Sequence, residues 1–324
     1  MSKFKILIHG YGNIGKRHHK VLTKLNLKKI TCFTSKSQNI KNKIFNYQKN
    51  YKKKIASIIS TPSSMHLQNA LFYAKNKINI FVEKPISNNI KKKNFLLLKK
   101  LIRKNKLIFQ VGYCLKFLKS SEIFYNLLNK TLKKEKVLQI NLESFSNLKD
   151  WGKQKKNLRH PATYRKFGGG VILEMSHEID ILRWLLGEIK YVYCSSKNNK
   201  VFKSDVEDSC NFIADFENKL QAIVSMSYSN YKLSRFIEII TDKSVIKWNI
   251  YKGNILINKK TYFQSKKNHF SEMYTNQMKY FLKHLEKGQK IDYKHSIENS
   301  IKTLRVIESL KKSNRTKKRV RVAN

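Results

Sequence analysis

The stretch F-K-I-L-I-H-G-Y-G-N-I-G, residues 4–15, decides the fold because it predicts a strand, a glycine turn and a helix in that order. Its first six residues, ending at His9, form a short run typical of a β-strand. After the glycines, Val21 and Leu25 recur at helical spacing. A strand that passes through a glycine turn into a helix is the structural context that a dinucleotide-binding motif requires.

The three glycines of this turn have separate predicted roles. Gly10 permits the tight turn, Gly12 lets the backbone approach a pyrophosphate, and Gly15 allows the helix to pack closely on the sheet. Asn13 and Ile14 begin the helix, whose free N–H groups would meet the phosphates. A generic strand-to-helix turn is the alternative, and the flanking strand and helix disfavour it.

The predicted end of the second strand bears on the choice of dinucleotide. NAD sites usually carry an acid about 20 residues after the glycines, which binds the ribose 2′-hydroxyl. Here residues 34–37 read T-S-K-S and contain no acid. Ser35 and Lys36 suit a 2′-phosphate better, so the sequence favours NADP over NAD. The alternative is that Lys36 is one more lysine in a lysine-rich chain.

The remaining pattern changes character at about residue 119. Before it, predicted strands alternate with helices, which indicates a parallel sheet; the strands are 30–34, 55–60, 79–83 and 107–112, and the helices 64–76 and 91–104. After it, strands dominate: 137–145, 191–196, 209–216, 221–228, 236–241 and 245–249, with helices at 174–186, 271–287 and 296–312. We therefore expect an α/β Rossmann domain (1–118) and an α+β domain with an open, mostly antiparallel sheet (119–324), whose terminal helix could pack back on the first.

Composition excludes several classes of protein. The 324 residues suffice for two domains, and 41% hydrophobic residues suffice for their cores. The net charge of +47 raises the possibility of nucleic-acid binding, but the lysines are spread through nearly every segment rather than clustered. Four scattered cysteines without a C-x-x-C pair indicate neither a metal site nor disulfides. No apolar run reaches the roughly 18 residues of a membrane span, so we expect a cytoplasmic protein without membrane or nucleic-acid partners.

Glu83 stands out because it is the only acidic residue among residues 1–121. It lies in F-V-E-K-P, directly at the end of a predicted strand. Open α/β sheets bind ligands beyond the carboxyl ends of their strands, so Glu83 and Lys84 are expected to face the nicotinamide end of a cofactor. The alternative is a surface turn ended by Pro85.

A second group of chemically active residues follows three glycines at 168–170. Glu174, His177 and Asp180 recur every three residues in the predicted helix 174–186, so all three are expected to share one face. One histidine and two carboxylates without further ligands are weak evidence for a metal, and none is expected. The structural alternative is that His177 and Asp180 tie the helix to the sheet.

Five motifs in this order resemble the glucose-fructose oxidoreductase and inositol dehydrogenase family, often called Gfo/Idh/MocA. They are G-Y-G-N-I-G (10–15), S-T-P-S-S-M-H (60–66), E-K-P (83–85), V-G-Y (111–113) and G-G-G-V-I-L-E-M-S-H-E-I-D-I-L-R-W-L-L-G (168–187). The resemblance covers essentially the whole chain. The resemblance implies that Thr61 and Pro62 line the cofactor groove, that His66 lies nearby, and that Lys84 lies between nicotinamide and substrate.

The resemblance also implies a division of catalytic labour. His177 would exchange a proton with a substrate hydroxyl, and Lys84 would hydrogen-bond the same oxygen. Glu174 would orient the histidine or the sugar. Many members place an aspartate four residues before the histidine, whereas here a glutamate stands three before it, which puts the role of Glu174 in doubt. Lys116 also departs from the family, where arginine is more usual.

Substrate contacts are expected from Tyr113 and Asp180 and from a loop at the rim of the pocket. That loop contains Arg159, His160, Tyr164, Arg165 and Lys166. The resemblance implies an NAD(P)-dependent oxidoreductase that acts on a CH–OH group of a sugar or nucleotide sugar, in surface-polysaccharide or acidic-sugar biosynthesis. An NAD-dependent glycosidase and a non-catalytic NAD(P)-binding regulator are the alternatives. The open sheet predicts a homodimer or homotetramer.

Overall fold

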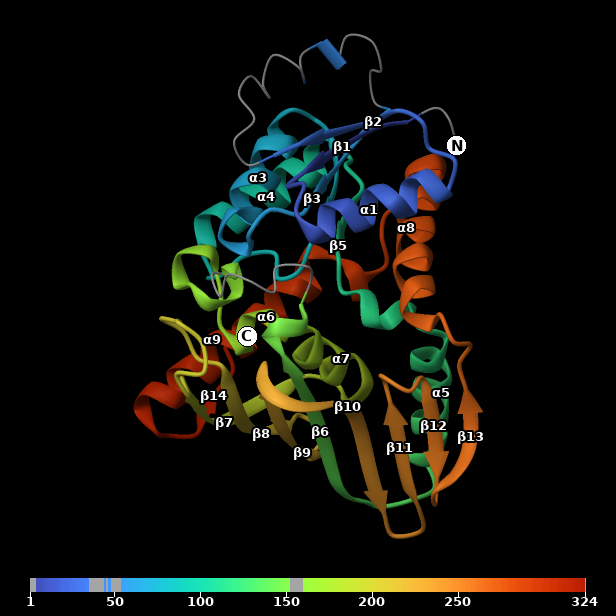
Figure 1. Ribbon diagram of the computed structural model, residues 1–324, viewed down its shortest axis with the longest axis vertical. Coiled ribbons are helices and arrows are strands. Elements are labelled where there is room, and N and C mark those ends of the chain that lie inside the picture. Colours follow the sequence, from blue (N-terminus) through green and yellow to red (C-terminus); the bar gives the residue numbers. More distant parts are fainter. Residues whose placement is uncertain (1–3, 35–43, 45, 48–53, 152–159, 324) are drawn as a thin grey trace. The chain divides into compact units, whose positions relative to one another are not determined.

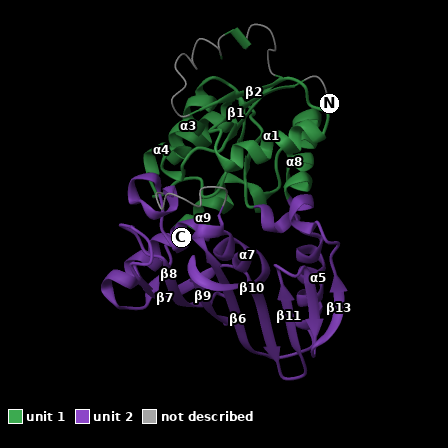
Figure 2. Ribbon diagram, in the orientation of Figure 1, with its two compact units in different colours: residues 1–113, 274–304 green, residues 114–273, 305–324 purple. Residues whose placement is uncertain are grey.

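The structure is a computed structural model that describes residues 4–34, 44, 46–47, 54–151 and 160–323. Contacts divide the chain into two compact units, shown in separate colours in Figure 2. Unit 1 comprises Met1–Tyr113 and Tyr274–Leu304, and unit 2 comprises Cys114–Met273 and Arg305–Asn324. The functional boundary expected between residues 118 and 119 stays a prediction.

Unit 1 contains a five-stranded sheet in the order β2-β1-β3-β4-β5. Its strands are β1 (Lys5–His9), β2 (Ile30–Phe33), β3 (Ile55–Ile59), β4 (Asn79–Val82) and β5 (Phe109–Val111). Every neighbouring pair is parallel. The chain leaves β1 toward β2 and returns to β3 on its other side, so the order reverses beside β1. Ligands of open α/β sheets bind at such a reversal, beyond the carboxyl ends of the strands.

Unit 1 also contains helices. They are α1 (Asn13–Lys24), α3 (Ser63–Lys75), α4 (Lys92–Lys104), α8 (His269–Lys287) and the first part of α9 (Ile297–Thr316), as Figure 1 shows. Leu22 of α1 and Phe281 of α8 pack with Ile6 and Ile8 of β1 in one buried cluster. Burying a side chain of this size contributes about 1.5–3 kcal/mol, so α8 is part of the core of unit 1.

Unit 2 is built on a nine-stranded sheet in the order β13-β12-β11-β10-β6-β9-β8-β7-β14. The strands are β6 (Val137–Asn147), β7 (Ile189–Lys197), β8 (Ser209–Phe216), β9 (Gln221–Ser227), β10 (Ser229–Thr241), β11 (Val245–Asn249), β12 (Asn254–Ile257), β13 (Lys260–Gln264) and β14 (Val320–Arg321). All neighbours are antiparallel except β6 and β9, which are parallel. The predicted fold class, a parallel Rossmann sheet followed by an open, mostly antiparallel sheet, is confirmed.

One face of this second sheet is covered by helices. They are α5 (Lys119–Thr131), α6 (Val171–Glu174), α7 (Ser176–Leu186) and the last part of α9. The Phe124 ring of α5 lies 5.2 Å from the Trp248 ring of β11, and Ser313 of α9 accepts a hydrogen bond from the Cys194 N–H of β7. Short 3₁₀ turns complete the chain: η1 (Cys114–Phe117), η2 (Leu148–Asp150), η3 (Pro161–Thr163), η4 (Arg165–Phe167) and η5 (Tyr293–His295).

The helix predicted for residues 174–186 is confirmed from Ser176 to Leu186, but its predicted start at Glu174 is wrong. Met175 adopts φ −96° and ψ 29°, which ends α6 at Glu174 and lets α7 begin at Ser176. Glu174 therefore does not share a helical face with His177 and Asp180, as the regular three-residue spacing had implied. Only His177 and Asp180, both in α7, keep that relation.

Candidate active site

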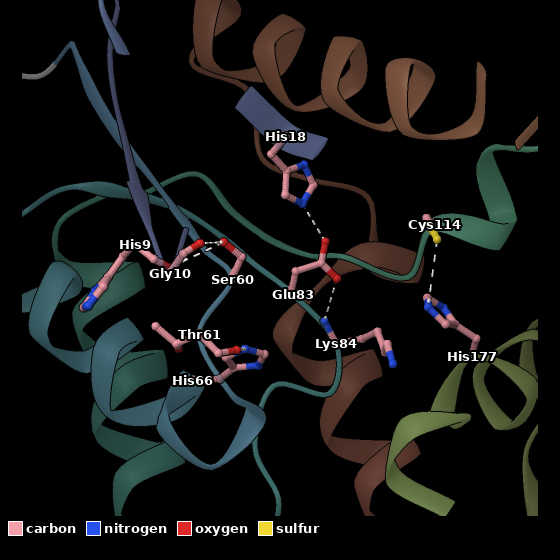
Figure 3. A network of polar contacts seen from close by, with 10 residues as sticks. All are labelled: His9, Gly10, His18, Ser60, Thr61, His66, Glu83, Lys84, Cys114 and His177. Atoms are coloured by element: carbon pink, nitrogen blue, oxygen red, sulfur yellow. Dashed lines mark hydrogen bonds and ion pairs between the residues drawn. The ribbon is translucent and has the colours of Figure 1, made fainter. Parts of the chain in front are cut away.

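The glycine turn after β1 has the geometry that its sequence predicts (Figure 3). Gly10 has φ +99°, and a Cβ there would lie 2.5 Å from the backbone carbon of Ser60, so only glycine fits. The Gly10 carbonyl accepts a hydrogen bond of 2.7 Å from the Ser60 hydroxyl. The ends of β1 and β3 are thereby joined at the point where the strand order reverses.

Gly12 and Gly15 meet different surroundings. A Cβ on Gly15 would lie 2.0 Å from the Gly10 carbonyl oxygen, whereas a Cβ on Gly12 would meet nothing within 4 Å. Gly12 is the N-cap of α1, which has no side-chain cap and no acid in its first turn, where Asn13 and Ile14 lie. Open space beside uncapped N–H groups fits a dinucleotide pyrophosphate. Ser35 and Lys36, the predicted NADP determinants, lie outside the described residues.

Glu83 follows β4 and is bound by its own chain rather than left open. Its Oε1 accepts a hydrogen bond of 2.7 Å from Nε2 of His18, a fully buried residue of α1. Its Oε2 accepts a 3.3 Å bond from the Lys84 N–H. Burial alone would raise the pKa of Glu83, but His18 and Lys84 outweigh burial and hold it below its usual range. Glu83 is therefore ionised, and its carboxylate links His18 of α1 to the backbone N–H of Lys84 (Figure 3).

His66 in α3 bridges two main-chain segments. Its Nε2 lies 2.7 Å from the carbonyl oxygen of Thr61, and its Nδ1 lies 2.7 Å from that of Pro85. Thr61 also accepts a 3.1 Å bond on its hydroxyl from Asn69, and Pro62 precedes α3 as its N-cap. Thr61, Pro62, Glu83 and Lys84 therefore lie at the carboxyl ends of β3 and β4, with His66 holding the two segments together.

The predicted proton carrier of unit 2 lies on α7. His177 is partly exposed, and its Nε2 lies 3.9 Å from the Cys114 thiol of η1. One turn further, Asp180 forms an ion pair of 2.8 Å with Lys116, also of η1. The Lys116 and Asp180 side chains are 1% and 2% exposed, so this is a buried pair. Tyr113, another predicted substrate contact, is a buried residue that follows β5 in unit 1.

A second buried ion pair anchors the first turn of α7. Glu178 is 1% exposed and accepts from Arg235 of β10 at 2.5 Å and from the Ser144 hydroxyl of β6 at 2.8 Å. Burial disfavours the charge on Arg235, but the Glu178 carboxylate outweighs it and raises the pKa of Arg235. Sequence reasoning missed these three residues. A signal was available, because Ser144 and Arg235 are polar residues at positions of β6 and β10 where the alternation of the strand predicts an inward-facing side chain.

The rim loop makes contacts of its own. Burial lowers the pKa of His160, and the charge of the Glu174 carboxylate opposes that shift. The Arg165 N–H donates to an Asp205 carboxylate oxygen at 2.7 Å, and its guanidinium donates to the Asp205 carbonyl at 3.2 Å. Tyr164 is half-buried beside it, whereas Arg159 lies outside the described residues.

The segment that precedes α6 is held by close packing. Gly170 has φ +108°, and a Cβ there would lie 2.5 Å from a carboxylate oxygen of Glu207. Burial raises the pKa of Glu207. A Cβ on Gly169 would lie 2.3 Å from the Ala162 carbonyl oxygen. The glycines of this motif therefore serve packing between the rim loop and the residues before β8.

The described residues lack two kinds of feature. They contain no group of three or more His, Cys, Asp or Glu side chains placed to hold a metal ion. They also contain no helix long and apolar enough to cross a membrane.

Fold and glycine turn together define a dinucleotide-binding Rossmann domain, and sequence comparison assigns the chain to a family of oxidoreductases. Residues 4–113 match the model of an oxidoreductase family with an NAD-binding Rossmann fold, and residues 137–247 match the GFO/IDH/MocA C-terminal domain. The chain belongs to the Gfo/Idh/MocA family of oxidoreductases. No curated protein matches the sequence.

Solved structures share the fold over the whole chain. GenD2 from gentamicin A biosynthesis, solved with NAD, has a TM-score of 0.81 at 13% identity, covering 100% of this chain and 97% of its own. Levoglucosan dehydrogenase with NADH and L-sorbose has a TM-score of 0.78 at 13% identity, covering 100% of both. The WlbA dehydrogenase of Bordetella pertussis with NADH and UDP-GlcNAcA has a TM-score of 0.77 at 13% identity, covering 99% and 98%.

Proposed function

We propose that the protein is an NAD(P)-dependent dehydrogenase or reductase that acts on a hydroxyl-bearing carbon of a sugar or nucleotide sugar. The observation that carries this proposal is the cluster at the carboxyl ends of β1, β3 and β4, where an uncapped glycine turn lies beside the Thr61 and Lys84 segments. The relatives solved with L-sorbose and with UDP-GlcNAcA support this class of substrate. Acidic-sugar or surface-polysaccharide biosynthesis is the setting we propose.

The residues of unit 1 would hold the cofactor. The turn from Gly10 to Gly15 would bind the pyrophosphate through backbone N–H groups, and Thr61 and Pro62 would line the groove. When bound, the nicotinamide supplies the hydride acceptor or donor. We propose NADP over NAD, because the residues that directly follow β2 in the sequence include Ser35 and Lys36 and no acid.

Two side chains would act on the substrate hydroxyl. The Lys84 ammonium would donate a hydrogen bond to the reacting oxygen and stabilise negative charge as it develops there. The His177 imidazole would accept the hydroxyl proton in oxidation and return it in reduction. An imidazole has an ordinary pKa near 6.5, which suits this exchange at neutral pH.

The remaining predicted residues would orient the sugar. We propose Tyr113, Tyr164, Arg165 and Asp180 as substrate contacts, with Glu174 orienting the sugar from α6. Asp180 would act while paired to Lys116, which limits it to accepting from ligand hydroxyls.

The test combines binding with turnover. NADPH and NADH are titrated into the protein by fluorescence, and nicotinamide absorbance is followed with a panel of sugars and nucleotide sugars. We expect tighter binding of NADPH, loss of turnover in His177→Ala and Lys84→Ala, and near-normal cofactor affinity in His177→Ala. Absence of affinity for both dinucleotides would end the enzyme proposal. Turnover without net absorbance change would indicate the glycosidase, and binding without any turnover the regulator.

A further inference from the structure

The two contacts of the His66 ring require two protons. Carbonyl oxygens only accept hydrogen bonds, and both ring nitrogens lie 2.7 Å from one, Thr61 after β3 and Pro85 after β4. A neutral imidazole carries a single N–H, so its second nitrogen would present a lone pair to the lone pairs of a carbonyl. Only the imidazolium donates in both directions.

The surroundings of the ring contain forces of both signs. His66 is 2% exposed. Burial is the largest influence and lowers the pKa of His66, and the Lys84 charge acts in the same direction; the two carbonyl oxygens and the Glu83 carboxylate oppose them without outweighing them, so the net direction is downward. The two 2.7 Å contacts argue against that direction, because a neutral ring cannot donate to both carbonyl oxygens. Glu83 is also the only acid among residues 1–121, and it is kept ionised by its bond to His18. A buried cation needs a negative charge nearby. Glu83 is ionised, and it is the only carboxylate that this part of the sequence supplies.

We propose that His66 is an imidazolium in the folded protein and that it is a positioning residue. Its two N–H groups donate to the carbonyl oxygens of Thr61 and Pro85 and so hold these two segments together. The Glu83 carboxylate supplies the negative charge that balances the His66 imidazolium. The consequence for cofactor binding rests on the proposed function, because that function places both segments at the cofactor groove. The number of protons on the ring does not depend on it.

The proton count is measured directly in the wild-type protein. Nitrogen NMR of ¹⁵N-histidine protein at neutral pH reports each ring nitrogen as protonated or not, and loss of a signal in His66→Gln assigns it. We expect both nitrogens of His66 to carry a proton. His9 is the internal control, since burial lowers its pKa and its Nδ1 has no hydrogen-bond partner among the described residues. One unprotonated nitrogen on His66 at this pH would overturn the proposal.

The role of the counter-charge is tested by Glu83→Gln. We expect the midpoint of His66 deprotonation to move to lower pH in this variant, because the carboxylate that favours the charged ring is gone. An unchanged midpoint would remove Glu83 from the proposal. Since Glu83→Gln takes no part in the proton count, a failure of this variant to fold leaves the main test intact.

Positioning is tested by NADPH affinity as a function of pH. In the wild type, affinity should fall as pH rises through the His66 midpoint, because one carbonyl contact is lost. His66→Gln should bind about tenfold more weakly at neutral pH, the effect of one good hydrogen bond, and should lack that step. Equal pH profiles for the two proteins would refute the positioning role. If no dinucleotide binds while His66 carries two protons, the proposed function fails and the proton assignment stands.

Discussion

Lys116 and Asp180 form an ion pair in which each charge depends on the other. Their side chains are 1% and 2% exposed and 2.8 Å apart, so neither charge is compensated by bulk water. A buried pair gains little net stability, because desolvation offsets the attraction, but removing one partner leaves a buried charge. The pair joins η1 to the helix that bears His177.

Lys116→Met is expected to lower the free energy of unfolding by about 3–5 kcal/mol, because Asp180 is left buried without its cation. Lys116→Arg, the usual family residue, should retain most of the stability. The double variant Lys116→Met with Asp180→Leu should recover much of the loss. Urea denaturation measures all three. A double variant less stable than Lys116→Met would show that the pair is not the source of the effect.

At this scale the sequence identified residues but not their partners. Glu83 stood out as a lone acid, yet its bond to His18 depends on packing between α1 and the end of β4. A signal existed, because His18 lies between Gly15 and Leu22 on the buried face of α1, where a polar side chain needs a partner. Glu178 and Arg235 are far apart in the chain, and nothing local links them.

Elements whose causes are local were predicted well. The strand, turn and helix of residues 4–24 depend on neighbouring residues alone. The break at Met175 does not: residues 171–186 contain no glycine or proline, and the segment is positioned by Glu207 against Gly170. The β12–β13 hairpin was missed because its turn consists of Asn258 and Lys259, both at positive φ. The usual sequence signal of such a turn is Asn-Gly, which this chain does not have there.

The glycine turn allows folding and binding to be separated within one element. Gly10→Ala should lower stability by several kcal/mol, since its Cβ would meet the Ser60 backbone at 2.5 Å and its φ is +99°. Gly12→Ala should fold normally, because its Cβ meets nothing within 4 Å, but should weaken NADPH binding by at least about tenfold, since the methyl occupies the pyrophosphate space. Thermal unfolding and fluorescence titration measure the two effects. A Gly12→Ala variant with wild-type affinity would mean that the dinucleotide does not approach this turn.

For the whole molecule, alternation of strands and helices was sufficient to predict both sheets. It did not decide which sheet each terminal helix covers. The apolar face of a helix predicts that the helix will be buried on that side, but it does not predict which sheet it will contact. Met278 and Phe281 of α8 pack with β1, the first strand of the chain. The dispersed lysines likewise describe solubility and attraction for phosphorylated ligands, and not the fold.

The open face of the unit 2 sheet provides the basis for the predicted homodimer or homotetramer. Tyr193, Ile213 and Ile223 are aligned by strand register on β7, β8 and β9, and they are 47%, 36% and 44% exposed. An apolar row crossing three strands is costly to leave in water, and we predict that a second copy of the same face covers it by two-fold symmetry.

The double variant Ile213→Asp with Ile223→Asp should therefore convert the oligomer to a monomer while the fold is retained, because four like charges would face one another across the two-fold axis. Light scattering coupled to size-exclusion chromatography measures the mass, and circular dichroism checks the fold. Val201→Asp is the matched control, since Val201 is also 44% exposed but lies outside the strands, and it should leave the mass unchanged. A wild-type monomer, or an oligomer that survives the double variant, would show that copies do not pair through this face.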